Sequence, residues 1–247
     1  MGERAALIAP LNSGGRADEL TARLTEAIQL GLVANGHRLP PEHEFAEQLG
    51  VSPMTLRDAI AVLRDRGLVE TKRGRNGGTF VTRSIEPDET PDRARLAGLP
   101  VSALRDICDE QRAITSLAAR LAAERASDSS VTKLLALVDR MDSAATRGAR
   151  MRADSRFHIE VAIATRSERL TRREVSLQAE TVGLLWLSEL DEAEAVAIVE
   201  EHREIAGAIA EQNPTRAQAV AENHVLQNLR RLAGLHLKLV EGEEDRS

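Results

Sequence analysis

The feature that most constrains the fold is a tight join between two short helical segments within residues 39–67, LPPEHEFAEQLGVSPMTLRDAIAVLRDRG. Pro41 fits the first turn of a helix, and Gly50 fits its end. Ser52 and Pro53 then supply an N-cap and a first-turn proline for the next helix. Because so few residues separate the two segments, the second helix must turn sharply across the first. This pattern predicts a helix-turn-helix whose second helix, residues 53–66, can enter a DNA major groove.

The segments on either side complete a recognisable order. A helix with apolar residues at helical spacing starts at Asp18 and stops near residues 34–36, ANG. After the second helix of the pair come two short strand patterns, LVETK at 68–72 and TFVTR at 79–83. They are joined by RGRNGG, in which Asn76-Gly77 is a strong hairpin signal. The order helix, helix, turn, helix, hairpin predicts a winged helix-turn-helix over residues 12–83.

The charge distribution agrees with a nucleic-acid partner at this end of the chain. The whole chain has a formal charge of -6. Residues 1–83 carry 11 Lys/Arg against 10 Asp/Glu, whereas residues 84–247 carry 22 against 29. Within 57–83 there are seven basic residues and three acidic ones. The acidic excess therefore lies in the second part, and the local basic count fits DNA binding.

The rest of the chain predicts a second, wholly helical domain. A proline-containing linker is expected at 84–98, helices with apolar stripes at 99–240, and a mobile charged tail at 241–247. The predicted fold is therefore mainly α, with a small β-hairpin wing followed by an all-α bundle of six or seven helices. Aromatic residues make up only 2% of the chain, so its core must be aliphatic, and a single Cys108 excludes an internal disulfide or a cysteine-based zinc site.

Three histidines and one aspartate occupy inward positions of the second domain. Asp154 and His158 are four residues apart and share one side of a helix. His202 and His224 each interrupt an apolar stripe on a later helix. A single such histidine is usually a core residue with one hydrogen bond, but three together with a carboxylate need a common partner. Three imidazoles and one carboxylate suit a divalent metal ion, with Zn²⁺ as first choice and Ni²⁺, Mn²⁺ or Fe²⁺ as alternatives. The neighbouring Glu160 and Glu201 are expected to point away.

The predicted DNA-binding residues lie at the start of the second helix of the pair and in the wing. Arg57 can bond a guanine edge or a phosphate, while Ser52 and Thr55 sit beside a helix N-terminus that favours phosphate. Each basic side chain taken alone could equally be a solvated surface charge. The full predicted set is His43, Ser52, Pro53, Met54, Thr55, Arg57, Arg64, Lys72, Arg73, Gly74, Arg75, Asn76 and Gly77.

Residues 36–81, GHRLPPEHEFAEQLGVSPMTLRDAIAVLRDRGLVETKRGRNGGTFV, resemble the GntR family of bacterial transcription regulators. The helical remainder resembles the ligand-sensing FCD domain of the FadR-type subfamily. The resemblance implies a homodimer on a palindromic operator, and a repressor or activator that responds to a small organic acid. It places DNA contacts at Ser52, Pro53, Met54, Arg57, Arg73 and Gly74, although many relatives carry Arg and Thr where this chain has Pro53 and Met54, and often Arg at His43. It also places the metal at Asp154, His158, His202 and His224, and an effector carboxylate at Arg112.

Other classes of protein remain open at this stage. A histidine-rich metal centre also suits hydrolytic or oxygen chemistry, but no nucleophile motif or phosphate loop accompanies it. An architectural DNA-binding protein, in which the metal only stabilises the bundle and Arg112 is an exposed helix charge, is a further alternative. No apolar run approaches the length of a membrane span and no signal peptide is apparent, so a cytoplasmic protein is expected.

Overall fold

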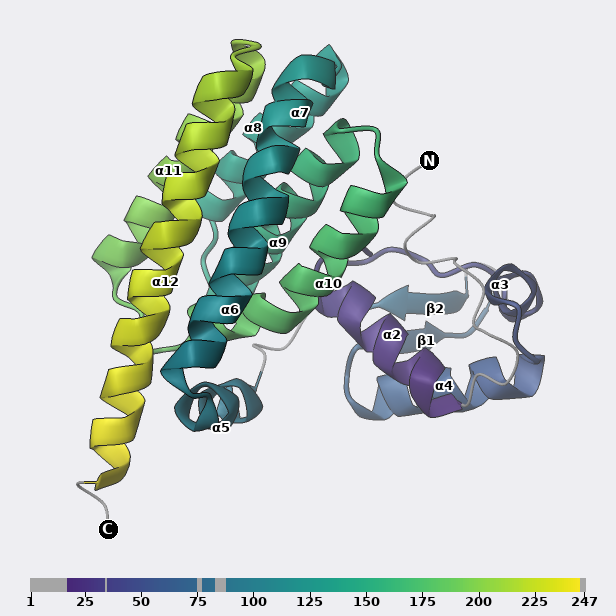
Figure 1. The fold of residues 1–247 in the computed structure, drawn as a ribbon. Helices are drawn as coiled ribbons and strands as arrows, with labels where there is room; N and C mark the ends of the chain where they lie inside the picture. Colours follow the sequence, from purple (N-terminus) through teal and green to yellow (C-terminus); the bar gives the residue numbers. More distant parts are fainter. Residues whose placement is uncertain (1–16, 34, 75–76, 83–87, 245–247) are drawn as a thin grey trace. The chain divides into compact units, whose positions relative to one another are not determined.

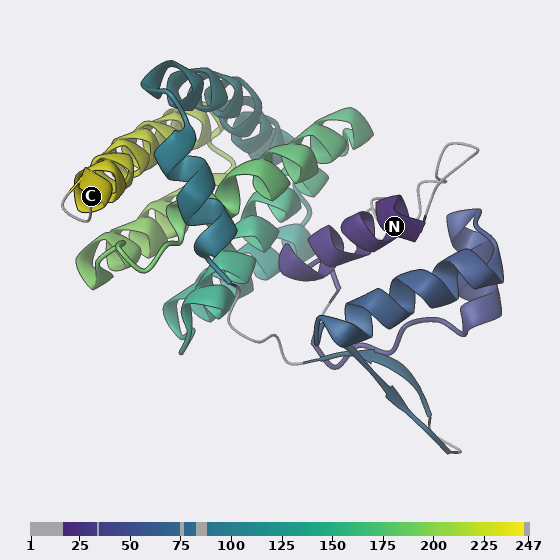
Figure 2. The same ribbon diagram turned by 90° about the horizontal axis from the view of Figure 1, so that it is seen from below.

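In the computed structural model, residues 17–33, 35–74, 77–82 and 88–244 are described, and they divide into two compact units. The first unit ends at Pro87 and the second begins at Asp88. In its described residues the first unit has three helices and a hairpin, and the second is built of helices (Figures 1 and 2). The mainly α fold with one β-hairpin is the fold that the sequence predicts.

The first unit contains the predicted helix-turn-helix. Gly50 ends the first helix of the pair in a left-handed conformation with φ of 69°, which glycine adopts at little cost. Ser52 then caps the next helix, its side chain accepting a hydrogen bond from the Thr55 backbone N–H. Aliphatic side chains from all three helices and Phe45 form one buried cluster. The helices are α2 (Ala17–Gln29), α3 (Glu42–Leu49) and α4 (Pro53–Asp65).

The wing is an antiparallel pair, β1 (Val69–Lys72) and β2 (Gly78–Val81), in which Val69 pairs with Val81. These two valines are buried and attach the hairpin to the helices. Phe80, next to Val81 on the same strand, is only half-buried, because Val81 takes the inward position. In Figure 2 the hairpin extends beyond the helices of its own unit.

The second unit is a bundle in which the central helix is buried on almost every side. That helix, α9, packs against α7, α8 and α10, while α12 packs along α7 and α11. Helices α6 and α7 are joined by a five-residue π-helical turn, η1, so residues 101–125 form one continuous helix. Counted this way, the described part of the unit has seven helices. Its elements are α5 (Thr90–Gly98), α6 (Val101–Gln111), η1 (Arg112–Ser116), α7 (Leu117–Arg125), α8 (Asp128–Asp142), α9 (Arg147–Ala164), α10 (Glu168–Leu185), α11 (Glu192–Ala210) and α12 (Pro214–Glu244).

The structure differs from the sequence expectation at both ends of this unit. Most of the expected linker, residues 84–98, is the helix α5, which buries Leu96 and packs against α10 and α12. The Asp92 side chain lies directly against Gly183, where any Cβ would collide with the carboxylate. At the other end α12 continues to Glu244, into the expected tail. Residues 83–87 and 245–247 lie outside the described part of the chain.

Candidate functional site

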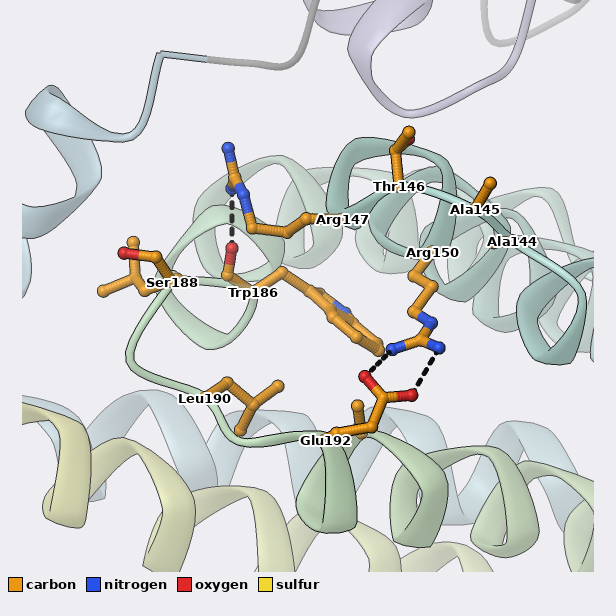
Figure 3. A pocket seen from close by; sticks show the side chains of 11 residues that line it. Ala144, Ala145, Thr146, Arg147, Arg150, Trp186, Ser188, Leu190 and Glu192 are labelled. Carbon is orange, nitrogen blue, oxygen red and sulfur yellow. Dashed lines mark hydrogen bonds and ion pairs between the residues drawn. The ribbon is translucent and has the colours of Figure 1, made fainter.

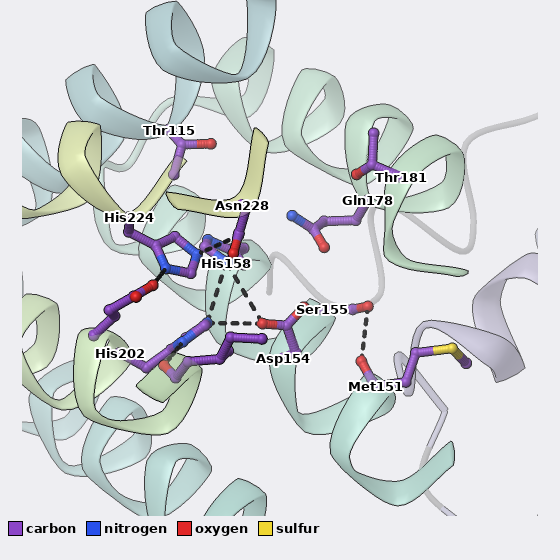
Figure 4. A network of polar contacts seen from close by, with 12 residues as sticks. Thr115, Met151, Asp154, Ser155, His158, Gln178, Thr181, His202, His224 and Asn228 are labelled. Carbon is purple, nitrogen blue, oxygen red and sulfur yellow. Dashed lines mark hydrogen bonds and ion pairs between the residues drawn. The ribbon is translucent and has the colours of Figure 1, made fainter. Parts of the chain in front are cut away.

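Four side chains from three helices of the second unit converge on one point in its core. Asp154 and His158 come from α9, His202 from α11 and His224 from α12. All four are buried, with exposed fractions of 5% or less. Ligand atoms of the three histidines lie within 4.8 Å of one another. The structure thus brings together all four predicted metal ligands (Figure 4).

The distances between these atoms suit a metal ion. His202 Nε2 lies 3.2 Å from His158 Nε2 and 2.8 Å from Asp154 Oδ1. Ligands about 2.1 Å from a tetrahedral ion stand about 3.4 Å apart, so shifts of a few tenths of an ångström would accommodate one. Asp154 Oδ1 is buried and has no well-directed hydrogen bond. An acceptor left in this state beside nitrogen lone pairs needs a cation or a donor.

Hydrogen bonds to the second nitrogen of two histidines leave their Nε2 atoms for the centre. His202 Nδ1 lies 2.7 Å from the carbonyl oxygen of Ile198, which can only accept, so Nδ1 carries a proton. His224 Nδ1 likewise donates to Glu201 Oε2 at 2.7 Å. In the neutral tautomers both Nε2 atoms therefore present lone pairs, as metal binding requires.

The position of Glu201 differs from the sequence expectation. The sequence predicts that it points away from the site. Instead, its carboxylate accepts a hydrogen bond from His224 and hydrogen bonds from both Nη atoms of Arg231. On α11, Glu201 lies beside the apolar stripe and not within it. His224 and Arg231 come close to Glu201 because α12 packs across α11. Glu160, by contrast, does turn from the centre, toward Arg156 and Lys133.

Burial and charge keep Asp154, His158 and His224 in metal-binding protonation states. Burial lowers the pKa of His158 well below 6.5 and also lowers the pKa of His224. For Asp154, burial would raise the pKa, but the contact with His202 outweighs it and lowers the pKa to about 2. Both histidines are therefore neutral and the aspartate is ionised at neutral pH. The side chains present fit a divalent cation.

A small polar cavity adjoins this centre. Its volume is about 20 Å³, which leaves room for about one water molecule. Arg112, the predicted effector-binding residue, does not line it and pairs instead with Glu222 of α12 and with Asp109. The cavity is lined by Gln111, Asp154, His158, Gln178, Thr181, Val182, Leu185, Asn228 and Leu232.

Apart from Asp154 and His158, the polar residues of this lining have no role in the sequence interpretation. Asn228 of α12 contacts His224 Nε2 through Nδ2 at 3.0 Å. Gln178 donates to the buried Glu174, and Gln111 donates to Thr181. The sequence does carry a signal for these residues. Side-chain amides at inward helix positions need hydrogen-bond partners, just as the histidines do.

In the first unit, the predicted DNA-contacting residues at the start of α4 share one exposed surface. Met54 is 67% exposed, Arg57 and Ser52 are also exposed, and Thr55 is half-exposed. Arg57 Nε donates to Glu42 Oε2 at 2.7 Å, a solvent-accessible pair that holds the guanidinium over α3. Such an exposed pair is weak enough to exchange for a phosphate or a base edge. Also exposed are His43, Pro53 and Arg64.

The wing contributes further exposed cations. Lys72 and Arg73 are exposed, and Lys72 Nζ lies 5.2 Å from the centre of the Phe80 ring. Gly74 has φ of 106°, which a side chain would strain, and its carbonyl accepts from the Gly77 N–H to close the turn. Arg75 and Asn76, two of the predicted contacts, lie outside the described residues.

Comparison with known proteins defines the class. Residues 16–81 match the family model for bacterial regulatory proteins of the gntR family, and residues 106–227 match the FCD domain. The chain belongs to the GntR family of transcription regulators and carries a C-terminal FCD domain. This membership sets aside the enzyme alternative.

Individual relatives agree with that assignment. The chain is 43% identical over 228 residues to a Mycobacterium gastri protein named as the HTH-type transcriptional regulator RmpR, covering 91% of this chain and 82% of that one. It is 25% identical over 218 residues to the Glc operon transcriptional activator of Escherichia coli K12, covering 84% and 85%. Among solved structures, E. coli McbR/YncC has the same fold, with a TM-score of 0.52 at 16% identity over 88% of this chain and 97% of that one. None of the described helices combines the length and apolar character needed to cross a bilayer.

Proposed function

We propose that this protein is a metabolite-responsive transcription regulator whose second domain holds a divalent metal ion. Asp154, His158, His202 and His224 would bind the ion, with Zn²⁺ the first choice. When bound, the ion would supply an electrophilic centre for an anionic oxygen of a ligand. The observation that carries the proposal is the convergence of these four buried ligands beside a polar cavity, in a chain of a DNA-binding regulator family.

We further propose that a homodimer binds a palindromic operator through α4 and the wing. The exposed N-terminus of α4, together with exposed Arg57, Lys72 and Arg73, supports this mode. A small organic acid at the metal would release the repressor from the operator. Because the present cavity holds only about one water molecule, admission of an acid must move its walls, and that movement is the means of regulation.

The DNA part of the proposal is tested by Arg57→Ala in a gel-shift assay with the operator. We expect the specific shift to be lost while the melting temperature is unchanged, because Arg57 is exposed and pairs with Glu42, which is also exposed. Arg140→Ala, on the exposed side of α8, is the matched control for loss of one positive charge. Unchanged operator affinity of Arg57→Ala would contradict the assignment of α4.

The metal and effector parts are tested by native mass spectrometry followed by DNA titration. We expect a dimer that carries one metal ion per chain, and an organic acid that weakens operator binding only when the metal is present. A metal-free monomer would contradict the proposal. The sign of regulation is read from a reporter gene behind the operator, where addition of the acid should raise expression.

The small cavity also favours a second candidate, in which the metal only stabilises the bundle. In that case a chelator should lower the melting temperature, whereas no organic acid should change operator affinity. The two candidates therefore differ in the acid titration and agree in the chelation experiment.

A further inference from the structure

A second cavity lies in the helical unit and shares no lining residue with the one beside the histidines. Its volume is about 420 Å³, within the range of roughly 300–1,000 Å³ typical of small-molecule sites. It forms where the connection between α8 and α9 meets the connection between α10 and α11 (Figure 3). We propose that this cavity binds a small carboxylate with an apolar body, and that Arg150 holds the carboxylate.

Arg150 is arranged as a carboxylate-binding residue. Its Nη1 and Nη2 atoms donate to the two oxygens of Glu192 at 2.7 Å each. This paired geometry is the one by which arginine recognises planar carboxylates. The Arg150 side chain is only 20% exposed, whereas that of Glu192 is 71% exposed. Arg150 is thus fixed in the wall, while its present partner stands largely in water.

Glu192 therefore occupies the position that a ligand carboxylate would take. An ion pair with one member so exposed contributes little to stability, since water can solvate the released carboxylate. Exchange of Glu192 for a ligand carboxylate keeps Arg150 neutralised and costs little. The exchange also opens the cavity at the first turn of α11, where Glu192 begins the helix.

The other walls suit an apolar body with a polar edge. Leu187, Leu190, Ala145 and Ala195 line the cavity together with Trp186, which is 2% exposed. In Figure 3 the indole of Trp186 extends toward the guanidinium of Arg150. Trp186 Nε1 and Arg150 Nε are both buried and have no hydrogen-bond partner.

One residue that lines the cavity also contacts the residue before α5. Arg147 lines the cavity, donates from Nη1 to the Trp186 carbonyl oxygen at 2.6 Å, and has Nε 3.8 Å from Glu89 Oε2. Glu89, the residue before α5, also accepts from the Ser188 backbone N–H at 2.9 Å. Binding in the cavity is therefore coupled to the contacts that anchor the first helix after residues 83–87.

The test uses the fluorescence of Trp186, the only tryptophan in the chain. The full-length protein is titrated with hexanoate, and with hexanamide as the uncharged counterpart, in the presence of a metal chelator. We expect a saturable change with hexanoate and none with hexanamide. Glu192→Gln removes the competing carboxylate and should tighten hexanoate binding about two- to fivefold, the worth of one exposed ion pair. Arg150→Gln should abolish binding.

Opposite responses of these two variants are the signature of the proposed exchange. Equal binding of hexanoate and hexanamide, equal affinity of Glu192→Gln and wild type, or no saturable change in either would overturn the proposal. Should Arg150→Gln fail to fold, the exposed Glu192→Gln variant still decides the question. Because the chelator keeps the histidine centre empty of metal, the outcome is independent of the function proposed for that centre.

Discussion

The contact between Glu201 and His224 makes a sharp prediction about metal affinity. Replacing Glu201 with Gln keeps the side-chain length and an oxygen that can accept the His224 Nδ1–H, but removes the negative charge. The change also leaves the nearly buried Arg231, 9% exposed, without its carboxylate partner. Asn228 Oδ1 still accepts from Arg231 at 2.8 Å, so Arg231 keeps one bond.

The expected loss of metal affinity follows from the position of this carboxylate. Groups that orient a metal-bound histidine typically contribute 10- to 100-fold, or about 1.4 to 2.8 kcal/mol. Since Gln preserves the hydrogen bond and loses only the charge, we expect about tenfold weaker binding for Glu201→Gln. Glu201→Ala is a poorer test, because it leaves both His224 and Arg231 without that partner and would destabilise the fold itself by about 3 kcal/mol or more.

The assay is a competition titration of Zn²⁺ against a chromophoric chelator, with thermal melts of the metal-free proteins alongside. Glu200→Gln is the matched control, because Glu200 precedes Glu201 on α11 but is 60% exposed and pairs with Arg203. The double variant Glu201→Gln with Arg231→Gln should recover stability and not metal affinity. A well-folded Glu201→Gln variant with wild-type affinity, or an equal loss in Glu200→Gln, would refute the reasoning.

Three further outcomes are expected. Burial raises the pKa of the Glu174 carboxyl from 4.5 to about 7, so the folded protein holds this proton more tightly than the unfolded chain. The free energy of unfolding of the metal-free wild type, relative to Glu174→Gln, should therefore fall as the pH rises through this interval, by about 3 kcal/mol at most. Denaturant titrations at several pH values measure this difference. A difference that does not change with pH would contradict the prediction. Gly183→Ala should lower stability by about 1–3 kcal/mol in a thermal melt, since the new methyl group meets the Asp92 carboxylate. Gly207→Ala is the control, because a Cβ has open space there, and it should not lower stability. Ser52→Ala should cost about 1 kcal/mol in urea unfolding through loss of the α4 cap, and an unchanged midpoint would show that water replaces it.

The helix-turn-helix could be predicted from the sequence because its signals are local. Gly50 and Ser52 specify a helix end and a helix start within three residues, and the structure shows both in those roles. The hairpin followed in the same way from Gly77 and the flanking strand patterns. At α9 the sequence was less informative, because residues are buried on nearly all sides and no apolar stripe marks its limits. Its start at Arg147 is therefore not marked by the sequence pattern.

The candidate centre was accessible to the same reasoning only in part. Helical spacing could place His158, His202 and His224 on inward faces, because that depends on each helix alone. The role of Glu201 depends on how α12 crosses α11, which no local pattern encodes. The second cavity could not be predicted from the sequence, because its walls come from two connections between helices. These connections come together only when the bundle is packed.

The hydrogen bond from His202 to the Ile198 carbonyl ties the imidazole to the backbone of its own helix. His224, although carried by α12, is tied to α11 as well, through Glu201. Two of the three imidazoles are therefore held in place by hydrogen bonds to α11, while Asp154 and His158 belong to α9. With both side chains held by these hydrogen bonds, we expect ions of different radius to be accommodated by a change in the separation of the two helices. The spacing between α9 and α11 should consequently differ from one bound metal to the next.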